Sequence, residues 1–342
     1  MQFAIFGSAQ AGSERPGSAL GEGFHDFVEF SVEAEALGYH ATFLVEHHFT
    51  GWNQVSAPLQ LLTWLAARTT TLRLGTAVLV LPWHNPVLLA EQAAMLDAMS
   101  GGHLDFGIGK GYRHTEFEGF CIPPEEAQAR FEEALEIILK AWTTRERFTH
   151  DGRFWHFKNV VVEPPPKQAP HPPLWTGAGS LASIKRAAQR GHHLILDQFA
   201  SADMLRERIA LFHAEAAACG RRCDPMQVVV ARDMFVVDNE REREAAIERN
   251  NQLHARTLSV SRAPDRAGGA HILAYAHTVE QQRDSPLIGS PDEILAKLET
   301  LSDAGVEYVM LNALGSRASL RRFAREVMPH VAAQPRCVKT GG

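Results

Sequence analysis

The stretch Gly75–Tyr112, GTAVLVLPWHNPVLLAEQAAMLDAMSGGHLDFGIGKGY, predicts a strand, a helix and a second strand that ends in a glycine-rich loop. The first strand, Leu72–Leu81, is an almost unbroken apolar run, as expected when both faces of a parallel strand are buried. Two prolines end it and open the helix, and Ser-Gly-Gly ends that helix. The second strand, Leu104–Gly109, runs directly into Lys110. A cation among glycines at the carboxyl end of a parallel strand is where an α/β barrel would hold a phosphate.

The rest of the chain repeats this alternation of strands and helices. The predicted strands are Phe3–Phe6, Thr42–Val45, Leu72–Leu81, Leu104–Gly109, Leu174–Gly177, His193–Leu196, Val228–Val237 and Tyr308–Asn312. The predicted helices are Gly23–Leu37, Pro58–Arg68, Val87–Met99, Glu125–Trp142, Leu181–Arg190, Ala202–Ala218, Glu240–Leu258, Pro291–Asp303 and Ser316–Met328. This order predicts an α/β fold, a single (β/α)8 TIM barrel over residues 1–333. A doubly wound sheet is the competing architecture, but it usually needs fewer strands, and no GxGxxG opens a first helix.

Three segments depart from the alternation. Asp-Gly turn chemistry between aromatic and β-branched residues predicts a hairpin insert at His150–Val162. The segment Ser259–Ser290 has little periodicity, which indicates either disorder or a long mobile loop that acts as an active-site lid. Residues 334–342 are expected to form a flexible C-terminal tail.

Composition excludes several classes of protein. With 342 residues, 45% of them hydrophobic, the chain can build one large core. Its net charge is −6 and no Lys/Arg cluster alternates with aromatic residues, so we expect no nucleic-acid partner. Apolar runs are too short for a membrane span, and no basic region precedes the first apolar stretch as in an export signal. The four cysteines show no metal or disulfide spacing, which favours a cytoplasmic location.

The second predicted strand ends in Glu46-His47-His48, at what would be the mouth of the barrel. Barrel enzymes keep catalytic residues there. Adjacent strand residues point to opposite faces, so His47 and His48 should not both face one site unless the strand has ended. The alternative is that both histidines only cap the strand end. The pair alone does not supply a metal site, and we predict none.

A second motif, Gly177-Ala178-Gly179-Ser180, joins the fifth strand to a helix. Ser180 stands at the N-cap position, where free backbone N–H groups and the helix dipole favour an anion. An ordinary helix cap is the alternative, but together with Lys110 the motif predicts a bipartite phosphate site. Asp97, Arg113 and Glu116 lie near the same end, and the residues alone favour salt-bridge roles for them.

These segments carry a family resemblance. LVEHHFTGW, LRLGTAVLVLPWHNPV, AMLDAMSGGHLDFGIGKGY and GAGSLASIKRAAQRG resemble the bacterial luciferase-like flavin-dependent monooxygenases, in the same order and spacing. The resemblance implies a (β/α)8 barrel that binds reduced FMN (FMNH2) supplied by a separate flavin reductase. It also implies reaction with O2 to a C4a-peroxyflavin, which oxygenates a small organic substrate. We further expect a homo-oligomer, with a dimer favoured.

The resemblance assigns roles to individual residues. His47 matches the family's catalytic histidine, His48 flanks it, and Glu116 matches an acidic residue near the flavin pocket; these three are the expected catalytic group. Ala77 and Val78 match a pair joined by a non-prolyl cis peptide beneath the flavin ring. The full set of expected cofactor-binding residues is Ala77, Val78, Lys110, Gly179, Ser180 and Ser183.

The chain also departs from the family. Lys110 replaces the usual arginine, Gly109 replaces a cysteine that is reactive in some luciferases, and Gly179 replaces an acidic residue and leaves only its backbone. The region Ser259–Ser290 does not match closely, so neither the long-chain aldehyde substrate nor light emission transfers.

Two other functions compete with this one. The first is hydride transfer with the deazaflavin F420 or with FMN on the same fold. The second is a non-catalytic flavin-binding subunit, which would not need the His47 imidazole. A metal-dependent barrel hydrolase would need a scatter of His and Asp at strand ends that the sequence lacks.

Overall fold

A computed structural model describes residues 1–7, 9–12, 19–261, 285–313 and 316–332. Parallel strands close into a barrel in the order β1–β2–β3–β5–β8–β9–β10–β12, and β12 pairs with β1. Their bounds are β1 Gln2–Gly7, β2 Ala41–Leu44, β3 Arg73–Thr76, β5 Leu104–Gly109, β8 Leu174–Gly177, β9 His193–Leu196, β10 Val228–Val236 and β12 Tyr308–Asn312. The predicted (β/α)8 barrel is confirmed.

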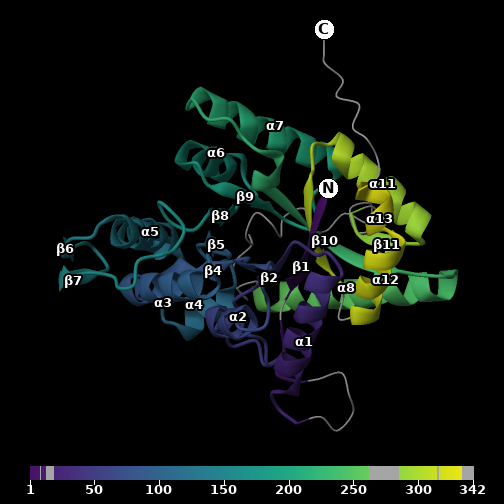
Figure 1. The fold of residues 1–342 in the computed structure, drawn as a ribbon, viewed down its shortest axis with the longest axis horizontal. Helices are drawn as coiled ribbons and strands as arrows, with labels where there is room; N and C mark the ends of the chain where they lie inside the picture. The colour runs from purple at the N-terminus through teal and green to yellow at the C-terminus, as the bar shows by residue number, and fades with distance from the viewer. Residues whose placement is uncertain (8, 13–18, 262–284, 314–315, 333–342) are drawn as a thin grey trace.

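Helices surround the strands, as Figure 1 shows. Their bounds are α1 Glu22–Ala36, α2 Pro58–Ala66, α3 Pro86–Met99, α4 His114–Gly119, α5 Ala127–Thr143, α6 Leu181–Arg190, α7 Ala202–Ala218, α8 Glu240–Ser261, α11 Pro291–Asp303, α12 Arg317–Glu326 and α13 Met328–Ala332. Helices α6, α7 and α11 have the predicted bounds. Helix α4 was not predicted because it is only six residues long. The last predicted helix is divided, since the backbone turns at Val327 between α12 and α13. No helix among these described residues is long and apolar enough to cross a membrane.

The prediction of one strand over Leu72–Leu81 is wrong. Strand β3 ends at Thr76, and a separate short strand, β4 (Leu79–Val80), follows a cis peptide between Ala77 and Val78. Both pieces pair with β5, through Gly75↔Asp105 and Leu79↔Ile108. From Gly75 to Leu79 the chain advances four residues, whereas β5 advances three from Asp105 to Ile108. The extra residue interrupts the hydrogen-bond ladder, as a β-bulge does. The apolar pattern does not reveal this break, because residues on both sides of it are apolar.

The predicted hairpin is present as β6 (Phe148–Asp151) and β7 (His156–Val160), which pair antiparallel. It lies beside α5 at the edge of the molecule, away from the strands of the barrel (Figure 1). The hairpin therefore decorates the barrel without interrupting it.

The segment Ser259–Ser290 differs from expectation at both ends. Helix α8 continues to Ser261, and β11 (Leu287–Gly289) pairs with the end of β10. Strand β11 is too short to be recognised from its pattern alone. The middle of the predicted lid, residues 262–284, and the predicted tail, residues 334–342, lie outside the described residues.

Aromatic side chains fill the barrel interior. The rings of Phe43, Trp175 and Tyr308 meet edge to face with centroids 5.9–6.3 Å apart. Gly75 makes room for them, because a Cβ at that position would lie 2.2 Å from the Phe43 ring. The packed interior leaves the carboxyl ends of the strands as the place for a ligand, as in other barrels of this type.

Candidate active site

The loops at the carboxyl ends of the strands surround a cavity of about 1240 Å³. This exceeds the roughly 300–1,000 Å³ of ordinary small-molecule pockets, so more than one small ligand fits. The sequence-predicted residues that line it are His47, Ala77, Val78, Lys110, Glu116, Gly179, Ser180 and Ser183. The fold thus brings every predicted site residue except His48 to one cavity.

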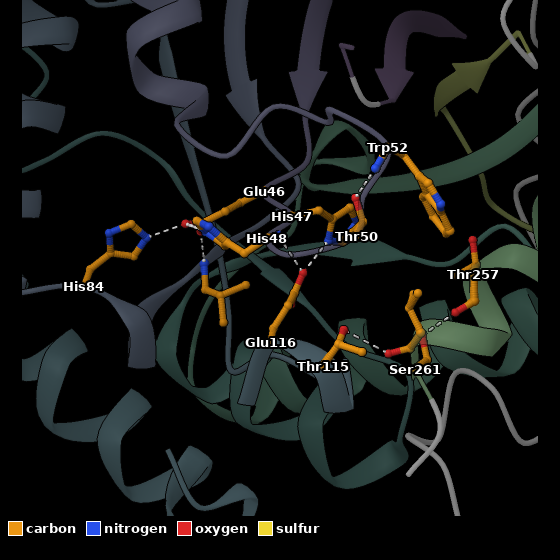
Figure 2. Close-up of polar contacts among 12 residues, drawn as sticks. Glu46, His47, His48, Thr50, Trp52, His84, Thr115, Glu116, Thr257 and Ser261 are labelled. Atoms are coloured by element: carbon orange, nitrogen blue, oxygen red, sulfur yellow. Dashed lines mark hydrogen bonds and ion pairs between the residues drawn. The ribbon is translucent and has the colours of Figure 1, made fainter. Parts of the chain in front are cut away.

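His47 forms a pair with the buried Glu116. Nδ1 of His47 lies 3.1 Å from Oε1 of Glu116, and the backbone N–H of His48 donates to the same oxygen at 3.0 Å (Figure 2). A carboxylate only accepts hydrogen bonds, so it holds the proton on Nδ1 and leaves Nε2 of the neutral ring as an acceptor. Burial lowers the pKa of His47, the hydrogen bond to Glu116 opposes this, and the charge of Arg113 lowers it further. The net pKa is below its usual value, so the imidazole is mainly neutral at pH 7.

His48 points to a different network, centred on the buried Glu46. Oε1 of Glu46 lies 2.9 Å from His48 Nε2 and 2.7 Å from His84 Nε2, and Oε2 accepts from the backbone N–H of Val80 at 2.7 Å. Burial favours the neutral form of Glu46, but these hydrogen bonds outweigh it and hold its pKa below the usual value. Figure 2 shows Glu46 between His84 and His48, to the left of Trp52 in the view. Glu46 therefore ties the end of β2 to β4 and positions His48 outside the cavity lining.

The predicted anion site lies at the N-terminus of α6, which lines the cavity. The Ser180 hydroxyl accepts from the backbone N–H of Ser183 at 3.2 Å and caps α6. The Ser183 hydroxyl lies in the same turn, and Gly179 precedes the cap in the cavity wall. Lys110 is exposed at the end of β5 and lines the same cavity. Backbone N–H groups, hydroxyls and one ammonium group together suit a phosphate.

Val78 lines the cavity and packs against the glycines at the ends of β5 and β8. The Ala77–Val78 peptide is cis, as the family resemblance implies. A Cβ at Gly109 would lie 2.5 Å from Val78 Cγ2, and one at Gly177 would lie 3.4 Å from Val78 Cγ1. Gly109 therefore gives space to Val78, which explains physically why a larger residue does not stand there.

Several cavity residues were not predicted as part of the site. Sequence reasoning gave Arg113 a salt-bridge role, but it makes no ion pair among the described residues and lines the cavity instead. Asp233, within β10, binds His254 of α8 with Oδ2 2.9 Å from Nε2. Trp52 lies under the Arg256 guanidinium, 4.9 Å from its ring centroid. The charged Asp233 inside the apolar strand Val228–Val236 was a usable signal, whereas the positions on α8 carried none.

The third residue with an expected salt-bridge role, Asp97, also makes no ion pair among the described residues. Its carboxylate accepts from the backbone N–H and the side-chain amide of Gln168 at 2.8 and 2.7 Å, away from the cavity. Within the described ranges, no group of three or more His, Cys, Asp or Glu side chains could hold a metal ion.

The fold and cavity define an α/β barrel that carries a buried histidine–carboxylate pair and a helix start suited to an anion at the carboxyl ends of its strands. The model of the luciferase-like monooxygenase family matches residues 1–308. The chain therefore belongs to the luciferase-like monooxygenases, a family of flavin-dependent oxidoreductases.

Individual relatives agree with this family. The oxygenase component of the flavin-dependent trigonelline monooxygenase of Acinetobacter baylyi is 27% identical, over 90% of this chain and 89% of that protein. The protein y4vJ of Sinorhizobium fredii is 34% identical, but the match spans only 57% of this chain and 55% of that protein. The crystal structure of the monooxygenase RslO1 from Streptomyces bottropensis superposes with a TM-score of 0.83 at 26% identity, covering 97% of this chain and 100% of that chain. Other relatives are named as FMNH2-dependent monooxygenases or as F420-dependent dehydrogenases, so membership leaves both cofactors open.

Proposed function

We propose that this protein is the oxygenase component of a two-component monooxygenase. It would take FMNH2 from a separate flavin reductase, use O2, and oxygenate a small organic substrate by the flavin–oxygen chemistry that the family resemblance implies. The observation that carries the proposal is the His47–Glu116 pair in the same cavity as the anion site. A non-catalytic flavin-binding subunit would have no use for a buried carboxylate that orients an imidazole.

The residues present suit FMN. Lys110, the backbone of Gly179 before α6 and the hydroxyls of Ser180 and Ser183 would hold its phosphate. Ala77 and Val78 would form the apolar wall for its ring system. When bound and reduced, the flavin supplies the electrons that activate O2.

The chain's own contribution is to bind, to exclude water and to move a proton. Glu116 keeps a proton on Nδ1 of His47, so Nε2 can take a proton from the reacting groups and return it. The lowered pKa of His47 suits the role of a base that stays neutral at pH 7. The apolar walls around Val78 limit the access of water.

The proposal also covers the cellular location and the oligomeric state. We infer a cytoplasmic location, consistent with the unpaired thiols of Cys121, Cys219 and Cys223, and a homo-oligomer, with a dimer favoured.

Hydride transfer with reduced F420 is the second candidate, because relatives include F420-dependent dehydrogenases. One experiment separates the two. Purified protein is supplied either with FMN, NADH and a flavin reductase, or with reduced F420 under nitrogen, and O2 uptake and cofactor oxidation are recorded with a substrate panel. Trigonelline, the substrate in the name of the Acinetobacter relative, is the first compound to add.

The oxygenase proposal expects O2 uptake and an oxygen-18 label from O2 in the product. A His47→Ala variant should lose most of this activity, while His48→Ala should retain more of it. Oxidation of reduced F420 by a substrate in the absence of O2 would instead establish the dehydrogenase function.

A further inference from the structure

Arg113 is a buried cation whose guanidinium has no hydrogen-bond or ion-pair partner in the described part of the protein. It lies between β5 and α4, has 3% of its surface exposed, and lines the cavity. Its Nε and Nη1 atoms are buried and make no hydrogen bond to any described group. The side-chain contact that it does make is with the Tyr112 ring, 5.9 Å from the ring centroid.

Two carboxylates that line the same cavity are engaged with other groups. Glu116 binds His47 and the backbone of His48. Asp233, on another wall of the cavity, binds His254 and accepts from the Asn312 amide at 2.7 Å. An arginine stays charged at any physiological pH, and a buried charge without a partner destabilises the protein. The missing anion is therefore expected to come from a ligand.

Two ligand anions have to be weighed. The flavin phosphate already has Lys110 and the start of α6 as its donors. Arg113, in contrast, is close enough to the reacting end of the cavity for its charge to affect His47. A group bound there would be fixed next to the imidazole that moves the proton.

We propose that Arg113 binds the carboxylate of the organic substrate, so that the substrates of this enzyme are small organic acids. This rests on the proposed oxygenase function. The planar guanidinium offers paired N–H donors that match the two oxygens of a carboxylate. Anchored in this way, the acid is oriented with its apolar part in the cavity beside His47.

The test compares acids with their neutral amides as binding probes, without turnover. Benzoate and benzamide, phenylacetate and phenylacetamide, and nicotinate and nicotinamide are titrated by calorimetry into the protein loaded with oxidised FMN. At least one acid should bind roughly ten- to a hundredfold more tightly than its amide. Arg113→Met should abolish this preference and leave the affinity for FMN unchanged, and Arg113→Lys should retain part of it.

Two controls distinguish a specific carboxylate site from a general charge effect and from a structural role of Arg113. Arg256→Met removes another arginine that lines the cavity, but an exposed one, and should keep the preference for acids. Arg113→Met without ligands should melt no lower than the wild type, because it removes an unpaired buried charge; a structural role would lower the melting temperature.

The proposal is overturned if no acid is preferred over its amide. It is also overturned if Arg113→Met weakens the binding of oxidised or reduced FMN together with that of the acid, since the arginine would then hold the flavin. If the acid preference is present but O2 uptake with FMNH2 is absent for every substrate, the oxygenase function fails and the anion site stands. If O2 uptake with FMNH2 is present but no acid is preferred over its amide, only the proposed role of Arg113 is rejected.

Discussion

Replacing Glu116 by glutamine tests whether the His47–Glu116 pair moves the proton. The change keeps the shape of the side chain and removes its charge. The glutamine carbonyl can still accept from the backbone N–H of His48, which lies 3.0 Å from Oε1, so the loop should stay in place. The loss is one charge-assisted hydrogen bond to His47, across 3.1 Å. Such a bond contributes about 1.5–3 kcal/mol, which predicts a turnover rate reduced by roughly ten- to a hundredfold.

The pH dependence should also move in one direction. Burial lowers the pKa of His47, and Glu116 acts against this by stabilising the imidazolium. Without the carboxylate the pKa of His47 falls further. The lowered pKa of His47 places the corresponding limb of the pH–rate profile below about pH 6.5. In the variant this limb should therefore shift to still lower pH.

The measurement combines two methods. Product formation is followed across the pH range in which histidine titrates, and the His47 ring is titrated by NMR, its signal being assigned by its absence in His47→Ala. Glu118→Gln is the matched control, because it removes a negative charge from an exposed position of the same helix. A His47 pKa that stays constant or rises in Glu116→Gln, or an equal rate loss in Glu118→Gln, would refute the reasoning.

Three further changes test the cofactor end and the surrounding structure. Lys110→Ala should weaken FMN binding by roughly tenfold at low salt, and by less at high salt because Lys110 is exposed. The affinity is measured by fluorescence titration, and an unchanged affinity would contradict the placement of the phosphate at Lys110. Gly109→Ala places a Cβ 2.5 Å from Val78 Cγ2 and should cost about 1–3 kcal/mol of unfolding free energy, measured by urea denaturation; no loss would mean that Val78 can move aside. Burial lowers the pKa of His192 to about 3, so the unfolded chain takes up a proton below pH 6.5 that the folded protein does not. Lowering the pH from 7 to 5 should therefore reduce the free energy of unfolding by about 2 kcal/mol. The His192→Asn variant should lose this part of the pH dependence. If it keeps it, His192 is not buried in the neutral form.

The sequence by itself determined the architecture and the position of the site along the chain. Apolar strands alternating with helices predict a parallel barrel, and a barrel of this kind places Glu46-His47-His48, Lys110 and the start of α6 at one end. These are local features, since strand pattern, glycine turns and helix caps depend on residues a few positions apart. For the same reason the predicted bounds of α6, α7 and α11 agree with the structure, whereas the short helix α4 was missed and the last predicted helix is divided.

Only the tertiary structure decided which side chains meet. His47 and Glu116 are 69 residues apart, and their contact depends on strand register and on the start of α4. The tertiary structure also places His48 against Glu46 and divides the apolar run at the Ala77–Val78 peptide. It buries Arg113 without a hydrogen-bond partner for Nε and Nη1. Pairing between distant positions follows from register and packing across the barrel, and no pattern within either segment records it.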